Sequence, residues 1–299
     1  MWLVTAILLP VFAVALAGVL YVYKEERASV DRSMRETTRA LALVVDREIA
    51  RREAILKTLA TAPDLDREDF ASFSRLAKSA APSLDATIIL SDLNGQQLVN
   101  SRIPAGQPLP KRVMFNQMRE GGNLDGTLVS NLYESPMSRQ FSFAVQVPVK
   151  RDGEVRFHLT LANHAAQLQP VWSDQRLPQA WIGAVVDKEG KLVARNRDVD
   201  RFLGRSASPD MVRSMAERPD GFIESTTLDG ISTVSFFSRA PSSGWGVIIG
   251  VPRDEVMRSA SRAVAVLLAV ALVLLGGGLV AAAWVGRTVV RPVRALAQG

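Results

Sequence analysis

The chain has 299 residues, a formal net charge of +6 and no cysteine. The absence of cysteine excludes disulfide bonds, thiolate nucleophiles and cysteine metal sites. Three arginines near the C-terminal end carry half of the net charge, so the high pI does not indicate a nucleic-acid partner. Alternation places His158 on a solvated strand face, and neither it nor His164 has neighbours typical of a metal or catalytic site. We therefore predict no catalytic residue, no metal site and no cofactor.

Residues 1–23 carry no charge and predict a first transmembrane helix. The uncharged stretch is longer than the apolar core of about 7 to 15 residues in a secretory signal, and no positive segment precedes it. We therefore predict an uncleaved anchor. The small residues Ala15, Ala17 and Gly18 leave cleavage open as the alternative.

Residues 24–60 predict one long helix, because apolar residues recur at three-to-four spacing and charges fill the other faces. Such a helix is about 55 Å long, well beyond the usual length in a globular domain. We predict that it is a stalk whose apolar stripe, including Met34 and Leu41, forms the seam of a homodimer. The alternative is an ordinary helix that lies on a sheet.

Residues 61–177 predict a first module of helices and strands. Asp69 is placed to cap a helix that ends near Ala80, and Asn94-Gly95 is typical of a tight hairpin turn. Residues 141–149 alternate between apolar and polar side chains, which predicts an antiparallel sheet with one solvated face. The predicted elements are strands at 86–91, 97–101, 127–132, 141–149 and 155–161 and short helices at 113–119 and 163–172.

Residues 178–252 predict a second module that repeats the first. The turn residues Gly95 and Gly190 are 95 positions apart, and Gly153 and Gly244 are 91 apart. We therefore predict an α+β fold with two tandem modules, each built on an antiparallel sheet of about five strands. The predicted elements are strands at 182–187, 192–196, 222–227, 232–238 and 245–251 and a helix that starts at Ser208-Pro209.

A connecting helix is predicted at 253–262, and a second transmembrane helix at 263–286. The latter stretch holds 24 residues without a charge, about 36 Å of helix, which is enough to cross a hydrocarbon core of about 30 Å. Arginines follow it at 287, 291 and 294, and such a cluster marks the cytoplasmic side of a membrane. Residues 24–262 are therefore expected outside the membrane and the C-terminal end in the cytoplasm.

Segment 287–299 contains Arg291-Pro292 and Leu296. It resembles the start of a HAMP linker, the helical relay below the last membrane helix of bacterial receptors. The whole order of elements resembles the double Cache (dCache) sensors, with two PAS-like modules, found in bacterial sensor histidine kinases and chemoreceptors. The stretch Ser91 to Asn100, followed by Pro104 to Pro110, resembles sensors fused to histidine kinases of the HWE type.

This resemblance implies that the first module is membrane-distal and binds a small molecule, while the second module is membrane-proximal and transmits the signal. Tyr133 and Arg139 flank a loop where the family lines its pocket, and we predict that Ser130 and Ser142 join them. The alternative is a surface arginine and a tyrosine at the edge of the core. The amino-acid-binding subset of the family carries an arginine followed by Trp-Tyr, and the lack of that tripeptide argues against an amino acid as ligand.

The resemblance further implies a receptor in the bacterial inner membrane, with residues 24–262 periplasmic or extracellular. Arg291, Pro292 and Leu296 would relay the signal through HAMP to a cytoplasmic output beyond this sequence, which we predict to be a histidine kinase of a two-component system. A methyl-accepting chemotaxis receptor or a diguanylate cyclase is the alternative output. A membrane-anchored envelope enzyme or scaffold is the alternative from another class.

Overall fold

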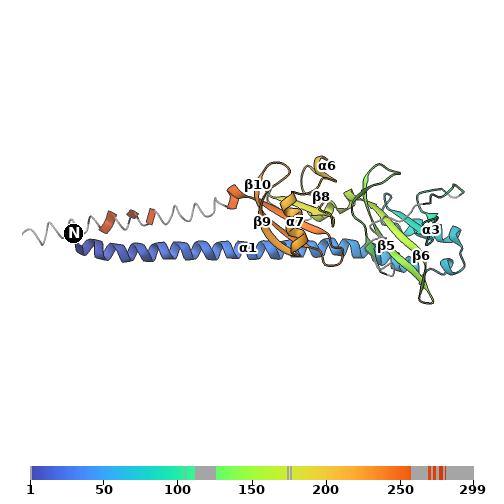
Figure 1. Ribbon diagram of the computed structural model, residues 1–299, viewed down its shortest axis with the longest axis horizontal. Helices are drawn as coiled ribbons and strands as arrows, with labels where there is room; N and C mark the ends of the chain where they lie inside the picture. Colours follow the sequence, from blue (N-terminus) through green and yellow to red (C-terminus); the bar gives the residue numbers. More distant parts are fainter. Residues whose placement is uncertain are drawn as a thin grey trace, which may run out of the picture. The chain divides into compact units, whose positions relative to one another are not determined.

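The computed structural model describes residues 2–104, 106–111, 126–173, 175, 177–256, 269–270, 272–273, 276–278 and 280. The chain divides into two compact units, one made of residues 1–34 with 253–299 and the other of residues 35–252. The larger unit contains both predicted modules and is drawn from blue through green to orange in Figure 1. The predicted short helix at 113–119 lies outside the described residues.

The N-terminal helix α1 spans Trp2–Ala60 without a break, which confirms the predicted long helix at 24–60. Two short helices follow it, α2 at Pro63–Asp66 and α3 at Phe70–Ala80. The predicted cap is present, because the carboxylate of Asp69 accepts a hydrogen bond from the backbone N–H of Ser72 at 3.0 Å.

The first module holds an antiparallel sheet with strand order β2-β1-β6-β5-β3, and β4 also pairs with β5. The predicted strand at 127–132 is reduced to the short strand β3, and a separate strand β4 begins only at Tyr133. Between them the backbone N–H of Leu132 donates to Asp187 of the second module instead of to β5. The strands are β1 Thr87–Ser91, β2 Gln97–Asn100, β3 Leu128–Val129, β4 Tyr133–Glu134, β5 Phe141–Arg151 and β6 Glu154–His164.

The predicted helix at 163–172 is shorter than expected and divided in two. Strand β6 continues to His164, a 3-10 helix η1 follows at Ala165–Leu168, and α5 spans Pro170–Ser173. Pro170 has no backbone N–H to donate to the preceding turn, so a continuous helix cannot pass through it with all its hydrogen bonds.

The second module holds a five-stranded sheet with the order β8-β7-β11-β10-β9. Its β7–β8 hairpin has the same irregularity as the β1–β2 hairpin of the first module. The register shifts between Leu90 and Ser91 in β1, and between Val185 and Val186 in β7, 95 positions later in the chain. The structure thus confirms the predicted repeat. The elements are β7 Ile182–Val186, β8 Leu192–Arg195, α6 Val199–Phe202, α7 Pro209–Glu217, β9 Asp220–Thr226, β10 Ser232–Arg239 and β11 Gly246–Pro252.

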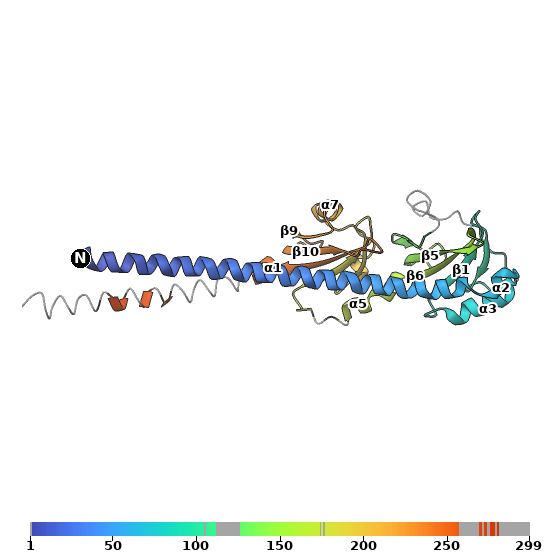
Figure 2. The same cartoon turned by 90° about the horizontal axis from the view of Figure 1, so that it is seen from below.

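Helix α1 packs on one face of both sheets. Its Asp46 carboxylate accepts hydrogen bonds from the backbone N–H groups of Ser242 and Ser243 in the second module, at 2.7 and 2.9 Å. Further along the helix, the Arg52 guanidinium lies 5.5 Å from the ring centre of Phe143 in the first module. Figure 2 shows α7 on the opposite face of the second sheet. We call the face of each sheet that points away from α1 its outer face.

The apolar stripe of α1 is largely used inside the chain. Leu41, Val45, Ile49 and Leu56 are buried within the larger unit, whereas Leu43 is exposed. This packing agrees with the alternative interpretation, a helix that lies on a sheet, and the homodimer seam stays a prediction.

None of the helices among the described residues is both long enough and apolar enough to cross a membrane. The predicted membrane segment at 1–23 forms the beginning of α1. Most of the other predicted segment, 263–286, lies outside the described residues, as does most of the connecting helix at 253–262. The HAMP-like stretch, with Arg291, Pro292 and Leu296, lies outside them completely.

Candidate functional site

The outer face of the first sheet carries buried polar side chains. Gln146 on β5 pairs with Thr160 on β6, and His158 on β6 pairs with Ser91 on β1. Directly paired residues share a face, so these four side chains lie together. His158 is 2% exposed, Gln146 3% and Ser91 8%. The predicted solvated face, with His158 on it, is therefore wrong: alternation shows that two faces differ in polarity, but not what covers the polar one.

His158 is the least satisfied group on this face. Neither of its ring nitrogens has a hydrogen-bond partner among the described residues. Burial lowers the pKa of the imidazole, which therefore stays neutral at neutral pH with one donor and one acceptor nitrogen. A buried polar group without a partner costs about 1 to 3 kcal/mol. Such a group calls for a partner that the described residues do not supply, such as water or a bound molecule.

The neighbouring side chains bond to one another and remain uncharged. The Thr160 hydroxyl donates to the side-chain oxygen of Gln146 at 3.2 Å. On β2, the Asn100 amide donates to the side-chain oxygen of Gln97 at 2.9 Å. Both of these β2 side chains are buried. Gln97 pairs with Ser91, and Asn100 pairs with the β1 residue two positions before Ser91, so both side chains lie on the same face as Ser91. A neutral polar patch therefore crosses the sheet from β2 to β5.

Three of the four predicted site residues lie along β5. Tyr133 pairs in register with Ser142, and the Ser130 hydroxyl accepts a hydrogen bond from the backbone N–H of Ala144 at 2.8 Å. The Ser142 hydroxyl contacts Nδ1 of His164 at 3.2 Å. Arg139 is separate from them: it is exposed, has φ 57° and ends the turn between β4 and β5. The roles predicted for the four residues remain predictions.

The segment that precedes β4 is bound by the second module. The buried Asp187 carboxylate accepts the backbone N–H of Leu132 at 2.9 Å through one oxygen. Its other oxygen accepts the N–H groups of Glu189 and Lys191 and holds its own hairpin turn. Burial raises the pKa of Asp187, and the three hydrogen bonds oppose that rise. We call this contact between segment 129–132 and the turn 187–191 the joint. Within it, the side-chain amide of Asn131 also donates to the carboxylate of Glu189, at 2.9 Å.

Part of the outer face of the second sheet is covered by apolar side chains of the same module. Met211 and Met215 of α7 pack with Phe237 and neighbouring residues in a buried cluster. A Cβ on Gly246 would lie 1.9 Å from the terminal methyl of Met215, so this glycine makes room for the methionine. Beside the cluster, a pocket with about 440 Å³ of empty space, its open mouth included, is lined mainly by apolar residues and reaches Arg195.

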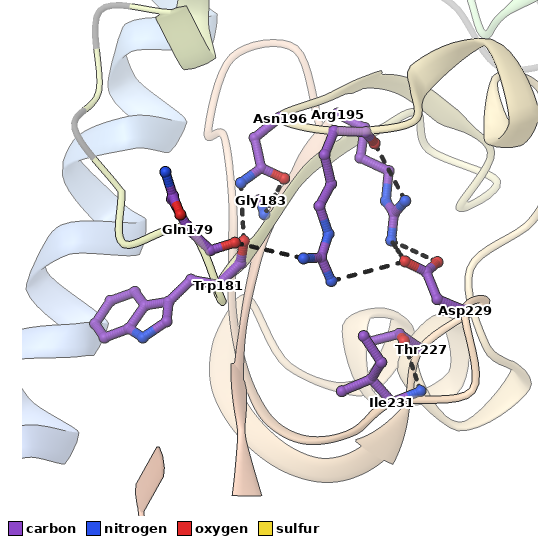
Figure 3. A network of polar contacts seen from close by, with 9 residues as sticks. Gln179, Trp181, Gly183, Arg195, Asn196, Thr227, Asp229 and Ile231 are labelled. Carbon is purple, nitrogen blue, oxygen red and sulfur yellow. Dashed lines mark hydrogen bonds and ion pairs between the residues drawn. The ribbon is translucent and has the colours of Figure 1, made fainter. Parts of the chain in front are cut away.

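Arg195, 2% exposed, is satisfied from within (Figure 3). Its guanidinium donates to both carboxylate oxygens of Asp229, at 2.7 and 2.9 Å, and lies 4.4 Å from the ring centre of Phe202. Arg197 forms a longer ion pair with the same carboxylate, at 3.8 Å. The buried charge of the second module therefore already has its counterion.

Sequence reasoning missed Gln146, His158 and Thr160 as site residues. The signal was present in the repeat. Aligning the two modules places Gln146 against Phe237 and Thr160 against Ile248, so polar residues in one copy face apolar residues in the other. A polar side chain at a position that the sister module uses for its core indicates a special role.

No protein-family model matches the sequence, and no curated protein matches it. Solved structures with the same fold include extracellular domains of proteins named as histidine kinases and ligand-binding domains of chemoreceptors. The extracellular domain of rpHK1S-Z16, named as a histidine kinase, aligns with TM-score 0.64 and 15% identity over 77% of this chain and 97% of its own. The ligand-binding domain of the Pseudomonas fluorescens chemoreceptor CtaA, in complex with L-isoleucine, aligns with TM-score 0.60 and 16% identity over 79% and 98%. The ligand-binding domain of Mlp24 with asparagine gives 0.57 and 16% over 80% and 99%.

Proposed function

We propose that this chain is the sensor region of a bacterial membrane receptor, and that its first module binds a small molecule on the outer face of the sheet. The observation that carries the proposal is His158, a buried imidazole with two unpartnered nitrogens in the described part of the chain. The fold supports it, because 77% of the chain aligns with 97% of one extracellular receptor domain. The second module, whose outer face is partly covered by α7 and carries a paired charge, then serves transmission.

The joint between the modules offers the first step of a signal. Segment 129–132 leads into β4, and it is fastened to the turn 187–191 by Asp187, Lys188 and Glu189. A ligand that shifts the edge of the first sheet would therefore displace the β7–β8 hairpin. Strand β7 pairs with β11, which ends at Pro252, next to the predicted connecting helix at 253–262.

We further propose that residues 24–262 lie outside the inner membrane between helices at 1–23 and 263–286, in a homodimer joined along α1. The signal would enter the cytoplasm through the HAMP-like stretch with Arg291, Pro292 and Leu296. A histidine kinase is the proposed output, and a chemotaxis receptor or diguanylate cyclase is the alternative. The similar structures include domains of both histidine kinases and chemoreceptors, so they favour neither.

The binding site is tested by thermal unfolding of the full chain in detergent against a library of small metabolites. A ligand at a hundredfold excess over Kd adds about 2.7 kcal/mol, and each kcal/mol raises the Tm of a domain of this size by about 2 to 4 °C. We expect at least one shift of several degrees, which His158→Ala abolishes. The matched control Ser235→Ala, a buried hydroxyl of the second outer face, should retain it. A shift that survives His158→Ala but disappears in Ser235→Ala would place the site in the second module.

A further inference from the structure

The proposed binding face carries no buried charge in the described part of the first module. Its buried polar side chains are all neutral: Thr87, Ser91, Gln97, Asn100, Ser142, Gln146 and His158, with Thr160 half-buried beside them. The next residue of β6 on the same face, Arg156, is exposed at the end of the strand. A charged group brought against this face would exchange water for neutral dipoles alone, which is costly without a counterion.

The second module shows how the same fold accommodates a buried charge. Arg195 occupies the position in β8 that Asn100 occupies in β2, since they pair with Ala184 and Ile89 respectively. The arginine is matched by the carboxylate of Asp229. At the equivalent place the first module has an amide bonded to another amide, Gln97. Among the residues that the structure describes, the first face thus lacks both the buried charge and the counterion found in the second module.

The unmet hydrogen-bonding capacity has a definite chemistry. The neutral imidazole of His158 offers one N–H donor and one acceptor nitrogen, and both lack partners among the described residues. A molecule that satisfies both must present an acceptor and a donor. Carboxamides, lactams and nucleobases do so without a net charge, whereas a carboxylate only accepts and an ammonium group only donates.

We propose that the ligand of the first module is an uncharged molecule carrying both an acceptor and a donor, of the carboxamide, lactam or nucleobase class. This inference rests on the proposed function, that the first module binds a small molecule on this face. It separates this chain from the similar chemoreceptor domains solved with free amino acids such as L-isoleucine and asparagine.

The test compares pairs of probes that share a skeleton and differ in charge: nicotinamide with nicotinate, uracil with orotate, and isobutyramide with isobutyrate. Each is added to the full chain in detergent, and Tm is measured at neutral pH for wild type, His158→Leu and the control Ser235→Ala. We expect at least one uncharged member to raise Tm by several degrees where its charged partner does not. His158→Leu should abolish that shift and Ser235→Ala should preserve it.

The outcomes separate the inference from the function on which it rests. A charged probe whose shift is lost in His158→Leu would leave the proposed function standing and overturn the ligand class. An uncharged probe whose shift survives His158→Leu, or no shift with any probe, would count against the binding face itself.

An independent measurement concerns the imidazole: ¹⁵N resonances of His158, assigned with a His164→Gln variant, should report a neutral ring at pH 6.5. A ring that is half-protonated there would overturn the neutral site whatever the probes show.

Discussion

The two modules share one backbone plan and finish the same face in different ways. Four positions that the strand register makes equivalent show the contrast: His158 and Gly246, Gln146 and Phe237, Thr160 and Ile248, and Asn100 and Arg195. In the second module methionines from α7 and an ion pair cover much of the face and leave the apolar pocket beside them. In the first it holds neutral polar groups, one of them without partners among the described residues.

This contrast between the two outer faces shows that the fold alone does not create a binding site. The strand order and the bulged first hairpin are the same in both copies, so the copies differ in the side chains that cover the outer face. Gly246 has no side chain where His158 has an imidazole, and that one difference admits Met215. Under the function proposed above, one copy is then a rigid transmitter, and the other stays incomplete, at a cost in stability, until a ligand binds.

The largest expected effect comes from breaking the internal charge balance of the second module. Asp229→Ala leaves Arg195 buried without its carboxylate partner, which destabilises a protein by about 3 to 5 kcal/mol. Urea unfolding followed by circular dichroism measures the loss. Asp210→Ala removes an exposed partner of Arg213 on α7 and should leave the midpoint unchanged. Equal midpoints for the two variants would show that Asp229 does not hold the second face together.

A smaller effect is expected at the joint. In Asp187→Asn the remaining oxygen still accepts the N–H groups of the turn. The amide group that replaces the other oxygen cannot accept the backbone N–H of Leu132. A buried N–H left without an acceptor lowers the free energy of unfolding by about 1 to 3 kcal/mol. Asp92→Asn is the matched control, because Asp92 is the equivalent residue and its Oδ1 accepts Asn94 and Gln96 in the same kind of turn. A loss of stability as large in Asp92→Asn would mean that the turn, and not the joint, depends on the carboxylate.

The smallest effect has the opposite sign. Replacing the unpartnered imidazole in His158→Leu should stabilise the unliganded protein by about 1 kcal/mol, because no polar group is then left unsatisfied. Since burial lowers the pKa of His158, the unfolded chain binds its proton first as the pH falls below about 6.5, and wild type loses stability there. Unfolding measured at pH 7.5 and 5.5 should show this loss in wild type and a smaller one in His158→Leu. A leucine variant that is less stable at both values would mean that the imidazole has a partner.

Much of the fold follows from local sequence. The helix at 24–60, the cap at Asp69, the turn at Asn94-Gly95 and the spacing of the repeat are properties of neighbouring residues, and each is confirmed. The errors arise where a distant partner decides. Leu132 leaves its predicted strand because Asp187, 55 positions on, takes its N–H.

The candidate site was harder to predict for the same reason. Alternation marked His158 as polar-facing and therefore solvated, but burial depends on what lies over the sheet, which no local pattern contains. The hydroxyls of Ser130 and Ser142 donate to the chain itself, to the carbonyls of Asn131 and Gln140, and their predicted place in a pocket stays a prediction. A polar residue read from sequence cannot show whether its partner is backbone, water or ligand.

The place of β11 in the second sheet has a consequence for how the protein is made. This last strand, Gly246–Pro252, lies in the middle of the sheet, between β7 and β10, so the preceding strands remain two separate pairs until it arrives. The turn before it also provides the N–H groups that bind Asp46, about 200 residues earlier in the chain. Contacts between such distant residues close slowly, and edges that wait for a partner are prone to pair wrongly. The second module therefore completes its sheet only after nearly all of residues 35–252 have left the ribosome, and a chain interrupted shortly before residue 246 would expose two open strand edges to its neighbours.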